Sequence, residues 1–115
     1  MRILWTGAFL LVLTMSANAN VTGITLKQNC DAPDMSAPAR YCLAYMTGVL
    51  DTIRGLGNTG DKRIFCEPAT VTGQQLLAML RKYLADHPER LHFAASSLVA
   101  DMYAETFHCD PPPTR

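Results

Sequence analysis

The sequence lacks an excess of charge of either sign. It contains 10 lysine and arginine residues against 10 aspartate and glutamate residues. Proteins that bind nucleic acid or an anionic membrane surface usually carry a basic patch or a basic excess. We therefore expect neither kind of partner for this chain.

The sequence also lacks an apolar run long enough to cross a bilayer. Its longest run covers residues 3–13, whereas a spanning helix needs about 20 residues. The run follows a short charged head and precedes an A-x-A site at residues 17–19. This order predicts a signal peptide, residues 1–19, with a retained membrane anchor as the alternative. We expect the mature part, residues 20–115, to be one small exported domain that leaves the membrane after cleavage.

Metal-binding and catalytic patterns are missing as well. The four cysteines are separated by 11, 23 and 42 other residues, and neither a C-x-x-C nor an H-x-x-x-H spacing occurs, so the sequence offers no metal site. Cys109 follows His108, but sequence neighbours do not face each other, and a helix C-terminus raises the pKa of a thiol. We expect no enzymatic activity, no metal and no cofactor.

Asp101 and Glu105 lie one helical turn apart, which is a spacing that suits paired carboxylates. Enzymes place such pairs in a cleft that separates their pKa values, and one exposed helix face does not supply a cleft. Ser96 and Ser97 have no histidine and acid at a helpful spacing. The two carboxylates are therefore either a solvated helix edge or a contact for a basic partner.

The sequence does contain a strong helical pattern between Cys66 and Cys109. Thr72 and Gln75 form a capping box before apolar residues at helical spacing. Pro88 favours the start of a second helix over about residues 89–107. A tight turn between these helices makes them antiparallel, and no segment shows a convincing strand pattern. The predicted fold class is all-α, a small helical bundle built on this antiparallel hairpin.

An even number of cysteines in a small exported domain favours disulfides. Two helices of similar length bring the chain before the hairpin back beside the chain after it. The predicted pairs are therefore Cys66 with Cys109 and Cys30 with Cys42. The first pair closes a separation of 43 residues, which stabilises the fold by roughly 4 kcal/mol on the loop-entropy model.

Residues 39–56 predict a third amphipathic helix, and residues 21–29 are either a short helix or an extended arm. The second helix of the hairpin has only a narrow polar edge. Such a helix is either central in its bundle or shared with another subunit, and we favour a homodimer. The proline-rich tail, residues 110–115, cannot be helical and is expected to be flexible.

Residues 57–63, GNTGDKR, form a polar, glycine-rich loop without an apolar anchor. We expect this loop to be exposed and mobile, and loops of this kind often carry contacts. A plain connector is the alternative. The candidate contact residues are Asn58, Thr59, Asp61, Lys62, Arg63, Asp101 and Glu105.

The motif order from Cys42 onward resembles that of the Tai-type immunity proteins. The chain contains, in order, CLAYMTGVLD, FCEPATVTGQQL, YLADHPER, LVA and FHC. The resemblance covers about residues 24–109. It implies a periplasmic, all-helical, disulfide-stapled protein, commonly a homodimer, without enzymatic activity. Its partner would be a cognate peptidoglycan amidase effector of the type VI secretion system, whose active-site cleft it blocks.

The alternative function is that of a general periplasmic acid-stress chaperone of the HdeA kind. Such proteins are also small, helical and disulfide-bonded, and they release apolar surface when acid protonates them. In this chain the acidic residues are dispersed and two disulfides are expected. Both features favour one rigid fold, so the immunity function is our first prediction.

Overall fold

The computed structural model describes residues 20–110, except for the side chain of Asp61. The helices in this range are α1 (Gly23–Cys30), α2 (Ala37–Gly55), η1 (Gly60–Lys62), α3 (Gly73–Asp86), η2 (Pro88–Arg90) and α4 (Ala95–Thr106), where η marks a single 3-10 turn. No strand forms among the described residues, and the predicted all-α fold is confirmed. The predicted signal peptide and residues 111–115 of the predicted tail lie outside the described part.

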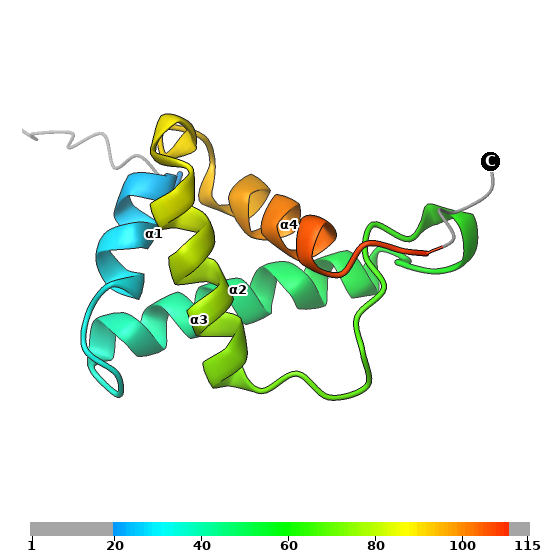
Figure 1. The fold of residues 1–115 in the computed structure, drawn as a ribbon, viewed down its shortest axis with the longest axis horizontal. Coiled ribbons are helices and arrows are strands. Elements are labelled where there is room, and N and C mark those ends of the chain that lie inside the picture. The colour runs from blue at the N-terminus through cyan, green and yellow to red at the C-terminus, as the bar shows by residue number, and fades with distance from the viewer. Residues whose placement is uncertain (1–19, 111–115) are drawn as a thin grey trace, which may run out of the picture.

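α2 is the longest helix, and the other three pack on it (Figure 1). α1 lies beside its first turns, α3 crosses it, and α4 lies over its second half. Each of the four α-helices contacts the other three. None of the described helices is long and apolar enough to cross a membrane.

The core is formed where the four helices meet. Each helix contributes side chains that are completely buried, for example Leu26, Met46, Leu80 and Leu98. These positions follow the helical spacing of the sequence, because an amphipathic helix buries one stripe of side chains. No polar or charged side chain is buried among the described residues.

α2 and α3 begin at side-chain caps. The Ser36 hydroxyl accepts a hydrogen bond from the backbone N–H of Ala39, at 3.3 Å. The predicted capping box of α3 is confirmed: Thr72 Oγ1 accepts from the N–H of Gln75, at 3.2 Å, and Gln75 Oε1 accepts from the N–H of Thr72, at 2.8 Å. These caps satisfy N–H groups that the helix itself leaves unpaired. The third predicted helix is confirmed as α2, which begins two residues earlier than expected.

The segment whose form the sequence left open is helical, and tertiary contacts hold its start. The N–H groups of Gly23 and Ile24 donate to the carbonyls of Phe93 (3.0 Å) and Leu91 (2.9 Å), while Thr22 makes no side-chain cap. A Cβ atom at residue 23 would lie 2.4 Å from Leu98 Cδ1 and 2.8 Å from the Leu91 carbonyl oxygen. Only glycine permits this close approach.

The prediction of one helix over residues 89–107 is wrong at its start. Pro88 begins the 3-10 turn η2, and α4 starts only at Ala95. Between them, the carbonyls of Leu91 and Phe93 bond to α1, and the N–H of Ala95 donates to Val21, at 2.8 Å. The chain leaves the helical path here because its backbone groups pair with α1.

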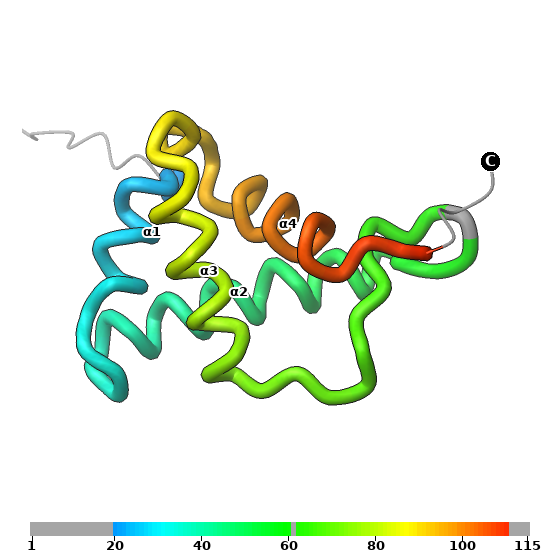
Figure 2. Tube along the Cα trace, viewed as in Figure 1, coloured from blue at the N-terminus to red at the C-terminus, as the bar shows by residue number. Residues whose placement is uncertain are grey.

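Both predicted disulfides are present. The Cα atoms of Cys30 and Cys42 lie 5.1 Å apart, and those of Cys66 and Cys109 lie 4.9 Å apart. The route to the second pair differs from the expected one. α3 and α4 diverge from their junction. The extended segment that precedes α3 in sequence runs from beside the end of α4 to the start of α3 (Figure 2). The Cys66–Cys109 bond therefore joins this segment, instead of the tip of α3, to the chain that follows α4.

Candidate functional site

The α2–α3 connection, residues 56–72, is the longest described segment without an α-helix. Five of the seven predicted contact residues lie in it. We call its first part, residues 56–64, the protruding loop. Figure 1 shows this loop beyond the end of α2, far from α1 and from the start of α3. It is the part of the described chain that projects farthest from the helical core.

The protruding loop is closed by the Asn58 side chain. Asn58 Nδ2 donates to the carbonyl of Phe65, at 3.1 Å, and Asn58 Oδ1 accepts from the N–H groups of Ile64 (2.6 Å) and Phe65 (3.4 Å). Gly57 and Gly60 have φ values of +98° and +59°, which glycine adopts without strain. These contacts give the loop backbone a turn, and the expected mobility of the loop stays a prediction. The amide of Asn58 serves that turn, and no finding tests its predicted contact with a partner.

The other predicted contact residues of the loop lie on its surface. Thr59, Lys62 and Arg63 are exposed, and Arg63 Nε donates to the carbonyl of Gly60, at 3.0 Å. The backbone of Asp61 belongs to η1, and its side chain lies outside the described part.

Two exposed apolar residues at the ends of the loop were missed by the sequence analysis. The exposed fraction is 84% for Leu56 and 52% for Ile64. Both line a hollow of about 160 Å³ together with Ile53 and Lys62. An exposed leucine directly before a glycine at a helix end was the available signal, since large apolar residues on a protruding loop often make contacts. The loop therefore presents apolar and cationic side chains together.

The base of the loop is fixed to α4 by two consecutive residues. Phe65 is 1% exposed and packs edge to face on Tyr103, with ring centroids 4.6 Å apart. Cys66 forms the disulfide with Cys109, and its N–H donates to the carbonyl of Phe107, at 2.7 Å. The chain is thus anchored covalently, by aromatic packing and by a backbone hydrogen bond at one point.

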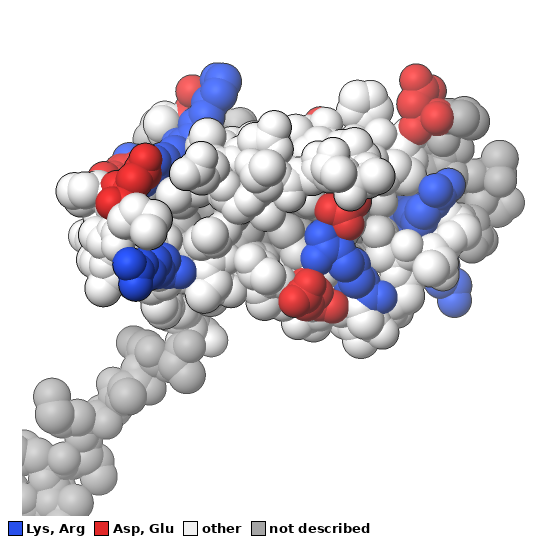
Figure 3. Space-filling model, turned by 90° about the horizontal axis from the view of Figure 1, so that it is seen from below, with Lys and Arg blue, Asp and Glu red and all other residues white. Residues whose placement is uncertain are grey.

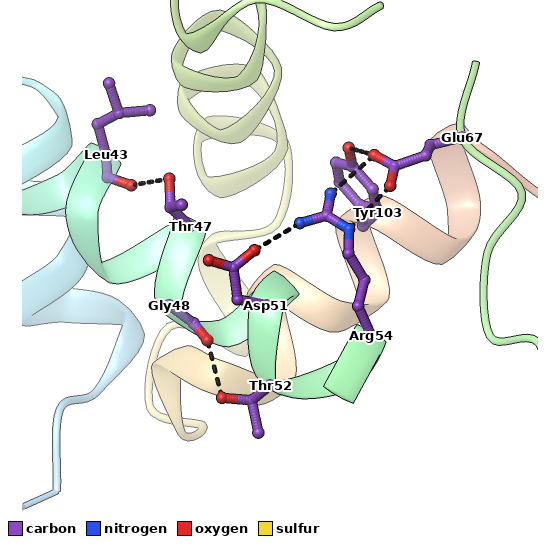
Figure 4. Close-up of polar contacts among 8 residues, drawn as sticks. All are labelled: Leu43, Thr47, Gly48, Asp51, Thr52, Arg54, Glu67 and Tyr103. Atoms are coloured by element: carbon purple, nitrogen blue, oxygen red, sulfur yellow. Dashed lines mark hydrogen bonds and ion pairs between the residues drawn. The ribbon is translucent and has the colours of Figure 1, made fainter. Parts of the chain in front are cut away.

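The next residue, Glu67, joins α2 to α4 through its carboxylate (Figure 4). Arg54 donates from Nε to Oε1 and from Nη2 to Oε2, both at 2.8 Å. Tyr103 donates its hydroxyl to Oε2, at 2.5 Å. Arg54 Nη1 also donates to Asp51 Oδ1, at 2.8 Å. A bidentate arginine and carboxylate pair fixes orientation as well as distance.

The protonation states suit this network. The hydrogen bonds from Arg54 lower the pKa of Glu67, the hydrogen bond from Tyr103 lowers it further, and burial opposes both. Burial raises the pKa of Tyr103 well above its ordinary value, and the hydrogen bond to Glu67 adds to the rise. Near neutral pH the carboxylate is therefore ionised and the phenol keeps the proton that it donates.

The predicted acidic strip, Asp101 and Glu105, is paired with a basic side chain. Arg90 lies between the two carboxylates, with Nη2 3.8 Å from Asp101 Oδ2 and Nη1 3.7 Å from Glu105 Oε1. Arg90 also donates to the hydroxyl of Tyr83. Burial is the main reason that the pKa of Tyr83 is raised, and Glu105 adds to it. The ion-pair partner of these two carboxylates thus belongs to the α3–α4 junction. The described hydrogen-bond partners of the predicted contact residues in the loop belong to the α2–α3 connection itself.

Charged residues of both signs are distributed over the surface. The face in Figure 3 carries them in small mixed groups separated by wide uncharged areas. Among residues 20–110, leaving aside the Asp61 side chain, no three His, Cys, Asp or Glu residues converge as metal ligands.

The family of the chain follows from its sequence over the same range. The model of a family described as Rap1a immunity proteins matches residues 22–109, which is most of the chain. The chain belongs to the Rap1a immunity protein family. Searches of curated proteins and of solved structures found no match. Family membership confirms the immunity-protein class that the motif resemblance indicated, and it implies binding to a cognate effector.

This Rap1a protein has a second hollow, between α2 and α4. It measures about 350 Å³ and is lined by Val49, Thr52, Ile53, Ser96, Ser97 and Ala100. These side chains are small or apolar. Gly48 also lies on α2, and a Cβ atom added to it would meet no other atom within 4 Å. The surface here is open enough for a second helix to approach closely.

Proposed function

We propose that this Rap1a protein is a periplasmic immunity protein of the Tai type. In this proposal it binds and inhibits a peptidoglycan amidase effector of the type VI secretion system. Family membership supports the immunity class, and the motif order from Cys42 onward supports the amidase as target. The predicted signal peptide supports the periplasm, where peptidoglycan lies. The protein acts by occupying the effector, without chemistry of its own.

The observation that carries this proposal is the protruding loop on its fixed base. The loop exposes Leu56 and Ile64 beside Lys62 and Arg63, and its base is held by a disulfide and a bidentate ion pair. A segment that is ordered before binding loses little conformational entropy in the complex. The loop therefore suits insertion into a cleft that has an apolar floor and acidic edges.

A second copy of the chain completes the proposed assembly. The hollow between α2 and α4 would receive that copy, because its lining is small and largely uncharged. α4 also has only a narrow polar edge, which fits a helix shared between subunits. Asp101 and Glu105 remain the candidate contacts for basic residues of the effector in this proposal.

The test is co-expression with a candidate amidase encoded next to this gene, exported to the periplasm together with this protein. We expect the wild-type protein to prevent lysis and to co-elute with the amidase on gel filtration. Undiminished lysis without a complex would refute the proposed function.

Two matched substitutions locate the surface. Leu56→Glu places a charge on the loop, at a side chain that is 84% exposed, and we expect affinity for the amidase to fall at least tenfold. Met35→Glu places the same charge at another apolar side chain, which is 73% exposed and lies between α1 and α2. It should leave affinity unchanged. Equal effects of both substitutions would argue against the loop.

A further inference from the structure

Three consecutive residues at the base of the protruding loop contact residues that are distant in sequence. We call this group the latch: Phe65, Cys66 and Glu67 with their partners Arg54, Tyr103, Phe107 and Cys109. The Phe65 ring and Cys66 contact α4 and the residues that follow it, while the backbone of Phe65 is hydrogen-bonded to Asn58 inside the loop. Glu67 is the latch residue that also reaches back to α2.

The ion pair of Glu67 spans the two ends of the loop. Arg54 lies two residues before Leu56, where the loop begins, and Glu67 lies three residues after Ile64, where it ends. Two parallel hydrogen bonds of 2.8 Å join these two side chains. Because the pair is bidentate, it fixes the direction in which the loop leaves the core as well as the width of its base.

Little else holds this side of the connection. Pro68, Ala69 and Thr70 are exposed, and a hollow of about 390 Å³ opens beside them, lined in part by Arg54, Glu67 and Tyr103. The disulfide fixes Cys66 to Cys109 but makes no link to α2. Backbone hydrogen bonds from Leu56 and Gly57 hold the start of the loop at the end of α2. Beyond them, the described side-chain links that orient the loop are the Glu67 carboxylate and, inside the loop, Asn58.

We propose that Glu67 is a positioning residue for effector recognition, whose carboxylate, shared by Arg54 and Tyr103, holds the protruding loop in the shape that the effector binds. This inference rests on the proposed function and deepens it. Glu67 itself need not touch the effector. Its loss leaves the helical core intact, because Glu67 is only partly buried at the edge of that core.

Acid should release the same contact. The charged or titratable groups around Glu67 are Arg54 and Asp51 on α2 and Tyr103 on α4. Arg54 and Tyr103 keep their protons throughout the acid range, and the contact of Asp51 is with Arg54. Protonation of Glu67 removes the charge that Arg54 and Tyr103 stabilise, so affinity for the effector falls as pH falls through the lowered pKa of this carboxyl.

The first experiment measures amide hydrogen exchange in the mature protein alone. We expect Glu67→Gln to speed exchange across residues 57–66 about tenfold and to leave the core helices unchanged. The control is Asp86→Asn, which removes a carboxylate that pairs with Lys82 on the surface of α3, at 2.5 Å. It should leave exchange in residues 57–66 unchanged. Exchange equal to wild type in Glu67→Gln would overturn the proposal.

The second experiment measures affinity for the candidate amidase used in the co-expression test. Glu67→Gln should bind about tenfold more weakly at pH 7 and should lack the decrease in affinity that we expect for wild type in acid. Tyr103→Phe keeps the ring that packs on Phe65 and removes the hydroxyl donor, so we expect a smaller change in the same direction.

These outcomes separate the two proposals. If the wild-type protein forms no complex with the amidase, the proposed function is overturned, and with it the role of Glu67 in recognition. Normal wild-type binding together with unchanged binding by Glu67→Gln would overturn only the positioning role, even if exchange in the loop is faster.

Discussion

At one end of α2, Cys30 and Cys42 are completely buried and join α1 to α2. At the other end, Cys66 and Cys109 are partly exposed and join the α2–α3 connection to the chain after α4. The first disulfide lies among helices whose apolar faces already pack together. The second holds a connection in which Phe65 is the one buried large side chain among the residues whose burial the structure describes. The buried end is thus stabilised mainly by packing, and the connection mainly by a few specific links.

The difference suits an immunity protein. A core that depends on many buried contacts tolerates changes on its surface, since each exposed side chain contributes little to stability. A connection held by a covalent bond, one aromatic pair and one ion pair can present a projecting surface without an apolar core beneath it. Loops that are positioned by a rigid scaffold are frequent sites of recognition.

The largest test of this comparison removes the exposed disulfide. Replacing Cys66 and Cys109 with serine should lower the free energy of unfolding by about 4 kcal/mol, because the bond closes a separation of 43 residues in the unfolded chain. Urea unfolding followed by circular dichroism measures the change. The corresponding loop term for Cys30 and Cys42, whose separation is 12 residues, is about 3 kcal/mol. A loss below about 1 kcal/mol in the first variant would show that the connection is held by other contacts.

A smaller effect on stability is expected when a buried leucine and an exposed leucine are each replaced by alanine. Leu80→Ala in α3 removes a side chain that is 0% exposed and should cost about 3 kcal/mol, because it leaves a cavity in the core. Leu56→Ala in the protruding loop should change stability by less than about 0.5 kcal/mol, because that side chain is 84% exposed. Similar costs in urea unfolding would contradict the division between a packed core and a linked connection.

The smallest change concerns pH. Folding lowers the pKa of Glu67 below its ordinary value of 4.5, so the stabilisation by this carboxylate is present above that value. It is lost as the pH falls through the lower pKa of the folded state. We expect the free energy of unfolding of wild type to exceed that of Glu67→Gln by about 1 kcal/mol at pH 7. The value is modest because the ion pair with Arg54 is partly solvated.

Measuring the free energy of unfolding of wild type and of Glu67→Gln between pH 7 and pH 3 tests this expectation. The difference between them should shrink below about pH 4.5, which is the ordinary pKa of a glutamate. A constant difference over this range would show that Glu67 stabilises the fold by some means other than its charge.

Local signals in the sequence predicted several elements correctly. Thr72 and Gln75 mark the start of α3 because a capping box depends on residues three apart. The apolar spacing of residues 39–56 predicted α2 for a similar reason. The break before Ala95 and the form of residues 21–29 could not be predicted, because the two segments exchange backbone hydrogen bonds with each other across about 70 residues of sequence.

The candidate site was predicted in part. The polar, glycine-rich composition of residues 57–63 placed the loop at the surface. The latch escaped prediction because Glu67 meets Arg54 and Tyr103 at separations of 13 and 36 residues, where no local periodicity relates them. The acidic strip was found, but Arg90, which stands between its carboxylates, was expected on the same continuous helix instead of on η2.

The sequence by itself determined the helical class, the cap of α3, the disulfide pairs and the immunity family. These follow from spacing within one helix, from cysteine number and position, and from motif order. Only the tertiary structure decided where the last helix begins, how α1 is held, and that Glu67 links both ends of the protruding loop. Each of these depends on groups that are distant in sequence, and their partners become defined only when the packed helices bring them together.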